Sequence, residues 1–243
     1  MFKIIKIDLV TSTSTALRQL CSDQILQSFT TLVAGEQTAG RGQTGTSWES
    51  EPYKNLTFST IFFPENLPVK QHFLISMIFA LSVKETLDKY TEDIFIKWPN
   101  DIYYRDKKIS GMLIENEITG SSIESSIIGI GINVNQDEFG SKAPNPISLK
   151  QITGERYDLM DLLESVLTLA REKYMQLLSG GGNWIHAEYQ NALYRKTGYY
   201  TYKDHNGCFK AKIKNVQKDG SLILETESGD ERKYFFKEVS FVI

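Results

Sequence analysis

The chain has 243 residues, enough for one large domain or for one domain with a small appendage. Hydrophobic residues make up 41% of it and the formal net charge is -3, so a packed core is feasible and a dedicated nucleic-acid binder is disfavoured. No apolar run approaches the roughly 20 residues of a membrane span, and residues 1–10 lack a signal-peptide pattern. Cys21 and Cys208 do not suggest a disulfide framework. We therefore expect a cytoplasmic protein without membrane association.

The first 194 residues predict strands that alternate with helices. Runs rich in β-branched and aromatic residues indicate strands over 2–10, 30–37, 55–63, 93–98, 107–118 and 126–135. Apolar residues at helical spacing indicate helices over 16–20, 70–90, 158–178 and 183–193. One of the hydroxyl residues between Thr11 and Thr15 is expected to cap the first helix. The strands over 107–118 and 126–135 flank a short turn, so we expect them to pair.

The character of the sequence changes near Tyr194. Short β-rich runs follow, and His205-Asn206-Gly207, Asp219-Gly220 and Gly229-Asp230 punctuate them as turns. A tail of about 50 residues of this kind predicts a small β-barrel or half-barrel. We expect an α+β fold, with helices on a mixed or antiparallel sheet over residues 1–194 and a small all-β domain over 195–243.

The stretch "GEQTAGRGQTGTSW", residues 35–48, is rich in glycine and nearly free of apolar residues. Gly35 and Gly40 have the spacing of a Walker loop, but Arg41 and Gly42 replace its lysine and hydroxyl residue. Residues 40–45 match a G-x-G-x-x-G string, yet no strand directly precedes it and no helix follows it. Glycine amides around Arg41 could instead hold a carboxylate or a phosphate. An ordinary surface loop is the alternative.

A second cluster, "KWPNDIYYRDKKISGMLIE", begins at Lys97. Asn100 and Asp101 follow a strand end and offer oxygens to a metal ion or a nucleotide. Lys108 offers a positive charge to an anion, and Gly111 permits close approach of a flat ligand. The alternatives are a simple turn after Pro99 and a solvated hairpin at residues 107–108.

A third cluster, "GIGINVN", contains glycines inside a strand pattern. Gly129 and Gly131 weaken a strand unless a ligand or another backbone must come close. Asn133 ends the same strand. A β-bulge or a sheet crossing is the alternative interpretation.

The three clusters, in this order, resemble the biotin protein ligases. "AGRGQTGTSW" is similar to the glycine–arginine biotin loop of that family, "KWPND" with the following lysine and glycine to its K-W-P-N-D segment, and "IGIGINVN" to its G-x-G-I-N strand. "TSTST" near the N-terminus resembles the family's S-T-N opening. The resemblance covers residues 11 to about 135, and the β-rich tail fits the family's SH3-like C-terminal domain. It implies a synthetase-like catalytic domain over residues 1–194.

The resemblance also implies a reaction in two steps. The carboxylate of biotin attacks the α-phosphate of ATP, which gives biotinyl-adenylate and pyrophosphate. A lysine of a biotin carboxyl carrier protein then attacks the adenylate, and AMP leaves. This chemistry needs positioning and charge stabilisation but no protein nucleophile. The chain shows no nucleophile–base motif, since His72, His186 and His205 are scattered.

The resemblance assigns roles to individual residues. Lys108 and Arg41 are the candidate catalytic cations, and Asp101 is the candidate ligand of Mg²⁺. The implied biotin-binding residues are Ser12, Thr13, Gln37, Gly40, Arg41, Gly42, Lys108, Gly111, Leu113 and Gly129. The implied ATP-binding residues are Arg41, Trp48, Asn100, Asp101, Gly131 and Asn133.

Two positions depart from the family pattern. Gln43 and Thr46 stand where the family often has arginine, so pyrophosphate binding and retention of the adenylate are the least secure expectations. Arg105 or Lys107 could compensate. The chain opens at the expected catalytic strand, without a helix-turn-helix region, so DNA repression is not expected.

Three other functions compete with this one. A lipoate or octanoyl ligase or transferase would share the fold, but the R-R-x-x-G-G-G segment of those families is absent, and Gly180 to Gly182 read as a linker. A non-catalytic biotin or nucleotide sensor is suggested only by Gln43 and Thr46. A DNA-binding regulator is disfavoured by charge. Monomer and homodimer both remain open, as does the identity of the carrier.

Overall fold

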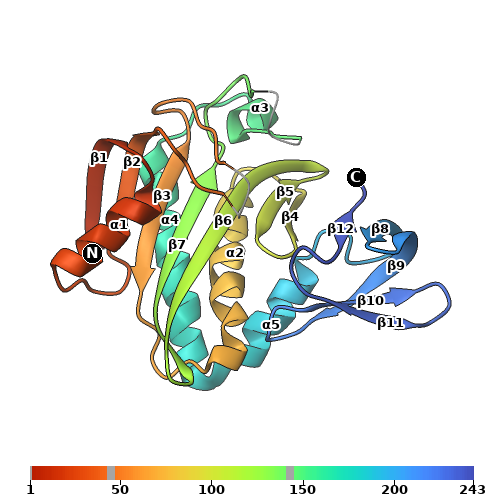
Figure 1. Ribbon diagram of the computed structural model, residues 1–243. Helices are drawn as coiled ribbons and strands as arrows, with labels where there is room; N and C mark the ends of the chain where they lie inside the picture. Colours follow the sequence, from red (N-terminus) through yellow and green to blue (C-terminus); the bar gives the residue numbers. More distant parts are fainter. Residues whose placement is uncertain (1, 43–46, 141–144) are drawn as a thin grey trace.

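The computed structural model describes residues 2–42, 47–140 and 145–243. These residues form two sheets with helices between and beside them (Figure 1). The seven-stranded sheet has the order β1-β2-β3-β7-β6-β5-β4. Its strands are β1 (Ile4–Val10), β2 (Thr31–Gln37), β3 (Leu56–Phe62), β4 (Ile94–Lys97), β5 (Asp101–Tyr104), β6 (Lys107–Thr119) and β7 (Ser122–Ile132). The pair β1–β2 is parallel and the other pairs are antiparallel, so the sheet is mixed as predicted.

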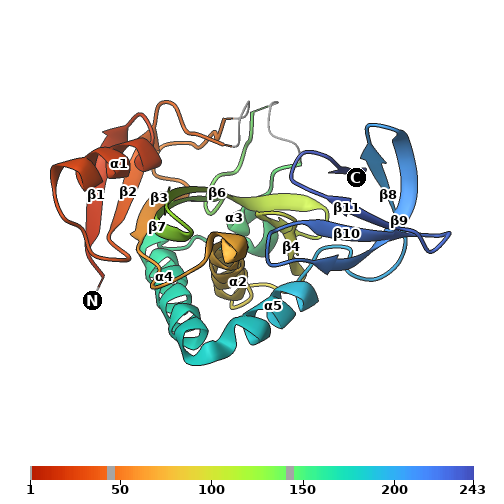
Figure 2. The ribbon, with the colours of Figure 1, turned by 60° about the horizontal axis from the view of Figure 1, so that its bottom comes forward.

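The helices cover the two faces of this sheet unequally. They are α1 (Thr13–Asp23), α2 (Phe73–Leu87), α3 (Leu149–Thr153), α4 (Leu159–Gln176) and α5 (Gly182–Asn191). Short irregular turns, Val69–Gln71 and Leu177–Gly181, precede α2 and α5. In both ribbon views α2, α4 and α5 lie on one face, whereas α1 lies on the opposite face beside β2 and β3 (Figures 1 and 2). The rest of that second face is therefore left for a site.

The first core forms because α2 is apolar nearly all round. Phe79, Leu81 and Val83 are all buried in it, together with residues of β3 and α4. All seven residues of β3 are buried as well, because α1 covers one of its faces and the other packs on the core. Strand β3 thus lies inside the protein rather than at a half-exposed surface.

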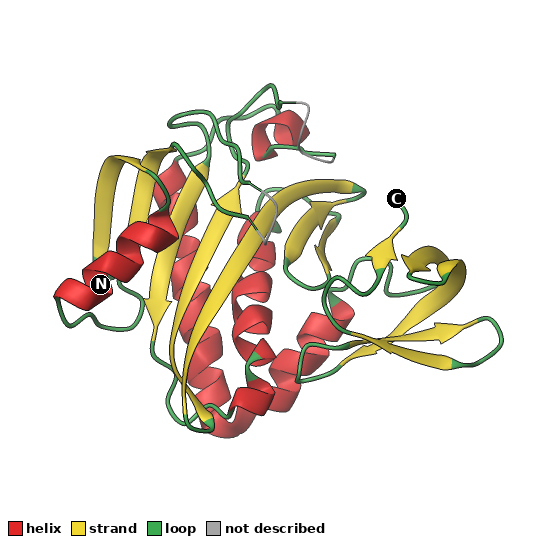
Figure 3. Ribbon diagram, viewed as in Figure 1, coloured by secondary structure: helices red, strands yellow, loops and turns green. Residues whose placement is uncertain are grey.

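Residues after 199 form the second sheet, which is antiparallel and has the order β11-β10-β9-β8-β12. Its strands are β8 (Tyr200–Asp204), β9 (Gly207–Val216), β10 (Leu222–Thr226), β11 (Glu231–Tyr234) and β12 (Ser240–Phe241). The predicted α+β class with a small all-β region is confirmed (Figure 3). The domain boundary between residues 194 and 195 stays a prediction.

The two sheets are joined by several hydrogen bonds. The segment before the second sheet runs along the edge strand β4, where the Ile96 amide donates to the Ala192 carbonyl (2.8 Å) and the Tyr194 amide donates to the Ile96 carbonyl (2.9 Å). The Trp98 indole donates to the Gly220 carbonyl at 2.9 Å. Core residues of both sheets belong to one continuous apolar cluster.

Some expected details differ in the structure. Ser12 occupies the N-cap position of α1, but its hydroxyl bonds to that of Ser14 at 3.0 Å instead of capping the helix. Asp101, expected after a strand end, begins β5. Helix α3 was not predicted, although the pair Ser148 and Gln151 forms the capping box that is a sequence signal for a helix start. No helix among the described residues is both long and apolar enough to cross a membrane.

Candidate active site

A cavity of about 450 Å³ lies on the same face of the seven-stranded sheet as α1. It occupies part of that face that the helix does not cover. It lies against β5, β6 and β7, beneath the glycine-rich loop that follows β2. The predicted site residues that line it are Ser12, Thr13, Gln37, Arg41, Gly42, Trp48, Asp101, Lys108, Gly111, Leu113, Gly129, Gly131 and Asn133. Four segments that are distant in the sequence therefore meet in one pocket.

One end of the cavity is neutral and rich in hydroxyl groups. The Thr13 amide and hydroxyl both donate to Oε1 of Gln37, at 2.9 and 3.1 Å. The Thr13 hydroxyl also lies 2.8 Å from that of Ser59 in β3. Ser12, Thr13 and Ser59 are buried, so their positions are fixed by the helix start and two strands. Fixed donors and acceptors of this kind suit a small uncharged polar head group.

The other end of the cavity is charged. Nζ of Lys108 lies 2.7 Å from Oδ1 of Asp101 on the neighbouring strand. The backbone of Lys108 is held as well, because its amide donates to the Asn145 carbonyl at 2.7 Å and its carbonyl accepts from the Ile147 amide at 3.0 Å. Its side chain is 26% exposed, so the ammonium group reaches the cavity without being free in solvent.

Glycines form the floor between these two ends. Gly111 of β6 faces Gly131 of β7 across the strand pair, and Gly129 faces Leu113 two residues further along. The Trp48 indole lies on this floor, since a Cβ atom at Gly131 would stand 2.2 Å from it. Side chains are thus missing at the point where the indole, or a flat ligand beside it, needs the space.

The loop that carries Trp48 is closed by its own glycine. The Trp48 amide donates to the Gly40 carbonyl at 3.0 Å, and a Cβ atom at Gly40 would lie 2.3 Å from the Trp48 carbonyl oxygen. Nε1 of Trp48 is buried and has no hydrogen-bond partner among the described residues. Nζ of Lys108 lies 5.8 Å from the centroid of the indole. The loop therefore places an aromatic ring and an indole donor at the charged end of the cavity.

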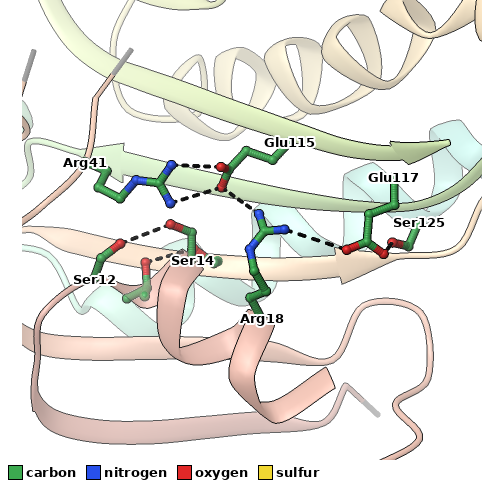
Figure 4. A network of polar contacts seen from close by, with 9 residues as sticks. Ser12, Ser14, Arg18, Arg41, Glu115, Glu117 and Ser125 are labelled. Carbon is green, nitrogen blue, oxygen red and sulfur yellow. Dashed lines mark hydrogen bonds and ion pairs between the residues drawn. The ribbon is translucent and has the colours of Figure 1, made fainter. Parts of the chain in front are cut away.

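The second cation of the cavity is Arg41. Its guanidinium donates to both carboxylate oxygens of Glu115 in β6, at 2.8 and 3.4 Å. Figure 4 shows this pair above the sheet, with Arg18 of α1 on the other side of the same carboxylate. The cavity thus combines a neutral polar end with two positive side chains, each paired with a carboxylate, and this arrangement suits a polar ligand that also carries an anionic group.

Comparison with known proteins agrees with this geometry. The sequence profile of the biotin/lipoate A/B protein ligase family matches residues 7–133, which is more than half of the chain. The chain belongs to that family.

The chain is similar to named biotin ligases over half or more of its length. The bifunctional ligase/repressor BirA of Bacillus spizizenii is 29% identical over 231 residues, which cover 93% of this chain and 70% of that protein. A biotin–[acetyl-CoA-carboxylase] ligase of Paracoccus denitrificans is 29% identical over 142 residues, which cover 55% of this chain and 58% of the relative.

A solved structure extends the similarity to the fold. The biotin protein ligase of Aquifex aeolicus, in complex with biotin and ATP, superposes with a TM-score of 0.80 at 28% identity. The superposition covers 99% of this chain and 98% of that one, so both sheets match the fold of a biotin protein ligase.

Two residues expected from the family pattern do not line the cavity among the described residues. Gly40 supports the loop instead, as described above. The Asn100 side chain donates a hydrogen bond to the Met112 carbonyl, and so ties the β4–β5 turn to β6. Gln43 and Thr46, the departures from the family's loop, lie outside the described residues. The assigned roles in binding biotin and ATP stay predictions.

Several cavity residues escaped the sequence interpretation of this family member. Ser14, Ser59, Phe139 and Pro146 line the cavity, and Glu115 holds Arg41. Ser59 lies in a strand whose residues are all buried, so alternation gave no signal for the face it takes. Phe139 and Pro146 belong to a connection without a recognised motif.

Lys97 of the K-W-P-N-D segment lies next to the cavity, because it is the cross-strand partner of Asp101. Burial lowers the pKa of Lys97, and the nearby ammonium of Lys108 lowers it further, while the Asp101 carboxylate opposes both effects. Its Nζ lies 5.1 Å from the ring centroid of Tyr103 and 5.0 Å from that of Phe241 in the second sheet. Lys97 therefore joins the charged end of the site to the C-terminal sheet.

The cavity offers few side chains that could bind a metal ion. The described residues contain no group of three or more His, Cys, Asp or Glu side chains that could hold one. Asp101 and Glu49 are the acidic residues along the cavity. One or two carboxylates are enough for Mg²⁺ that arrives with a nucleotide, since the ion keeps waters and phosphate oxygens as its other ligands. The cavity fits that mode and does not supply an all-protein cage.

Proposed function

We propose that this family member is an ATP-dependent biotin protein ligase. It activates biotin as biotinyl-5'-AMP and transfers the biotinyl group to a lysine of a biotin carboxyl carrier protein. The observation that carries the proposal is the single cavity with a neutral polar end, a glycine floor and two cations. A match along nearly the whole chain to a ligase that binds biotin and ATP supports it.

Neither formation of the adenylate nor transfer to the carrier requires a nucleophile from this protein. A biotin carboxylate oxygen bonds to the α-phosphorus of ATP, the bond from that phosphorus to the bridging oxygen breaks, and pyrophosphate leaves. The amine of the carrier lysine then attacks the acyl carbon, loses a proton to solvent, and displaces AMP. Negative charge gathers on the α-phosphate in the first step, so fixed cations lower its barrier. Lys108 and Arg41 are the candidates for that role.

The neutral end of the cavity suits the ureido ring of biotin. Ser12, Thr13 and Gln37 offer donors and acceptors there, and Gly129 and Leu113 supply the apolar wall beside them. In the proposed biotin site these residues act with Arg41, Gly42, Lys108 and Gly111, and Gly40 supports the loop that carries Arg41. In the proposed ATP site Trp48, Asp101, Gly131 and Asn133 act with Arg41, and Asn100 supports them from the β4–β5 turn.

Magnesium is part of the proposal. Asp101 is the residue that would hold Mg²⁺ together with the phosphates of ATP, and Glu49 stands on the same cavity. When bound, the ion would neutralise phosphate charge. Asp101 is paired with Lys108, so the same carboxylate also orients the proposed catalytic lysine.

We also propose a cytoplasmic location and residues 1–194 and 195–243 as the catalytic and SH3-like domains. The carrier is the protein partner, no nucleic acid or membrane takes part, and the ligase acts as a monomer or a homodimer. Relatives named as acetyl-CoA-carboxylase ligases support the carrier as substrate.

The deciding experiment is transfer of labelled biotin to a purified carrier domain with ATP and Mg²⁺, beside a lipoyl domain with labelled lipoate. Label on the biotin carrier alone is the expected result. Label on the lipoyl domain would favour a lipoate or octanoyl ligase or transferase. Biotin binding in a calorimeter without pyrophosphate release would instead identify a sensor.

A further inference from the structure

Two arginines from separate elements converge on one carboxylate at the rim of the cavity (Figure 4). Arg41 comes from the glycine-rich loop, and Arg18 comes from the middle of α1. Both contact Glu115 of β6, at 2.8 Å and 3.1 Å respectively. None of the cavity motifs in the sequence accounts for this contact.

The contact between Arg41 and Glu115 is a forked pair. One guanidinium nitrogen donates to Oε1 of Glu115 and the other donates to Oε2. Two parallel bonds fix the plane of the guanidinium as well as its distance, which a single bond does not do. The orientation of Arg41 toward the cavity therefore depends on Glu115.

Glu115 in turn is braced from the opposite side. Nη2 of Arg18 lies 3.1 Å from the same Oε2 of Glu115, and Nη1 of Arg18 lies 3.6 Å from Glu117. The buried Ser125 of β7 donates to Glu117 at 2.7 Å. A chain of contacts thus runs from two sheet strands through α1 to the loop, and Glu115 is the member that touches the loop.

The position of Glu115 on its strand connects it to the cavity. Side chains alternate along a strand, so Gly111, Leu113 and Glu115 point to the same face of β6. Gly111 and Leu113 line the cavity, and Glu115 is the next residue on that face. Arg41 lines the cavity as well, so the carboxylate meets it at the rim, not at a remote surface.

Charge and exposure indicate what the contact does. Arg41 and Arg18 are each more than 40% exposed, so these pairs add little to the stability of the fold. Glu115 is shared between two cations, and therefore cancels neither charge completely. The arrangement holds Arg41 in place and leaves part of its positive charge for an anion in the cavity.

We propose that Glu115 is a positioning residue for Arg41 in the reaction with biotin and ATP. This inference rests on the proposed ligase function. Glu115 does not touch the reacting atoms; it fixes the guanidinium that stabilises the charge on the α-phosphate. Arg18 holds Glu115 in the orientation that the fork requires.

The test compares Glu115→Gln with the matched control Glu117→Gln. Both glutamates lie on the same face of β6 and both contact Arg18, but only Glu115 contacts Arg41. Glu115→Gln should lower kcat/KM for biotinyl-adenylate formation on the order of 10-fold, because a displaced cation loses its alignment with the transition state. Glu117→Gln should stay within about 2-fold of wild type, and both variants should melt within about 3 °C of it.

A double variant separates positioning from a general structural effect. If Glu115 acts through Arg41, Arg41→Gln combined with Glu115→Gln should be no slower than Arg41→Gln alone. Additive losses would overturn the inference, as would wild-type adenylation in Glu115→Gln. Faster adenylation would overturn it too, because Glu115 would then be restraining Arg41. Failure of the wild-type chain to form any adenylate would instead refute the ligase function on which the inference rests.

Discussion

The two sheets of this protein use their cross-strand positions in opposite ways. In the seven-stranded sheet, β6 and β7 place Gly111 opposite Gly131. Neither residue has a side chain, so the floor of the cavity is flat at this pair. In the C-terminal sheet, β9 and β10 place Lys212 opposite Glu225, and the two side chains form an ion pair of 2.7 Å. The seven-stranded sheet thus lacks a side-chain contact at this cross-strand pair, whereas the C-terminal sheet has one at the pair Lys212–Glu225.

The difference shows where each sheet takes its stability. Cross-strand side-chain pairs support a sheet, and glycines weaken it. The seven-stranded sheet tolerates its glycine pair because α2 and α4 bury its other face. The C-terminal sheet has fewer helices against it, and further ion pairs, such as those of Lys214 with Glu231 and Lys233 with Asp219, stand on its exposed surface.

The largest effect is expected at Lys108, and Lys212, which forms an ion pair of the same length in the other sheet, is its control. Lys108→Ala should lower the rate of biotinyl-adenylate formation by about 10²- to 10³-fold, the usual loss when one fixed donor to a transition-state anion is removed. Lys212→Ala removes the same group from a 2.7 Å pair in the other sheet and should leave the rate unchanged.

The measurement is pyrophosphate release with saturating biotin and ATP, beside a melting curve for each variant. Wild-type rates in Lys108→Ala would remove Lys108 from the mechanism. An equal loss in both variants would mean that folding, not chemistry, is affected.

The glycine floor offers a graded test within one strand. A Cβ atom at Gly131 would lie 2.2 Å from the Trp48 indole, whereas one at Gly129 meets the Ser59 hydroxyl at an ordinary 3.4 Å. Gly131→Ala should displace the indole and raise KM for ATP at least about 10-fold, since placement errors near 1 Å are costly. Gly129→Ala should have a smaller effect. Steady-state kinetics with each substrate varied in turn would check this, and a reversed order would mean that Trp48 does not define the nucleotide end.

The contact between the two sheets can be weakened without touching the cavity. Trp98 is buried, and its indole donates to the Gly220 carbonyl of the C-terminal region. Trp98→Phe removes that donor and should lower the free energy of unfolding by about 1–3 kcal/mol. The half-exposed Trp184 is the control, and Trp184→Phe should cost less than about 0.5 kcal/mol. Urea unfolding measures both, and equal values would show that the indole bond adds nothing.

The smallest expected effect concerns acid stability of the C-terminal sheet. Burial would raise the pKa of Asp219, but hydrogen bonds from the Ser221 hydroxyl and amide and from Lys233 outweigh it and lower the pKa to about 2. The ionised carboxylate therefore stabilises the fold above the ordinary pKa of about 4, and this contribution is lost as the pH falls from about 4 to about 2. Solvent screening keeps the contribution below about 1 kcal/mol.

Asp219→Asn tests this sign. The variant should lose less stability than wild type between pH 4 and pH 2, and should be slightly less stable than wild type at pH 7. Thermal unfolding across that range provides the data. Parallel curves for the two proteins would show that Asp219 has the same pKa in the folded and unfolded chains.

The sequence predicted the helices and strands better than it predicted which side chains face the cavity. The strands over 107–118 and 126–135 were recognisable because a short turn joins them, and β6 and β7 do pair there. The cavity glycines were visible as breaks in a strand pattern. Ser59 was not, because a strand covered on both faces carries no alternation that tells which side faces the site.

Glu115 could not be predicted for a different reason. Charged residues near the end of a strand usually face solvent, so Glu115 and Glu117 carried no signal. Their partner Arg18 lies on a helix far away in the sequence, and local patterns cannot show such an ion pair. The family motifs predicted most of the residues that line the pocket, whereas the contacts that hold those residues in place became visible only in three dimensions.

The segment before the second sheet, which contains Ala192 and Tyr194, bears on how the protein unfolds. Its backbone pairs with Ile96 on the edge of the first sheet, and residues of both sheets share one apolar cluster. The C-terminal strands therefore cannot detach without exposing part of that cluster and breaking the hydrogen bond from the Trp98 indole to the Gly220 carbonyl. Although the chain contains two sheets, their unfolding should be coupled into one cooperative transition, and the site should lose its shape in the same step as the tail.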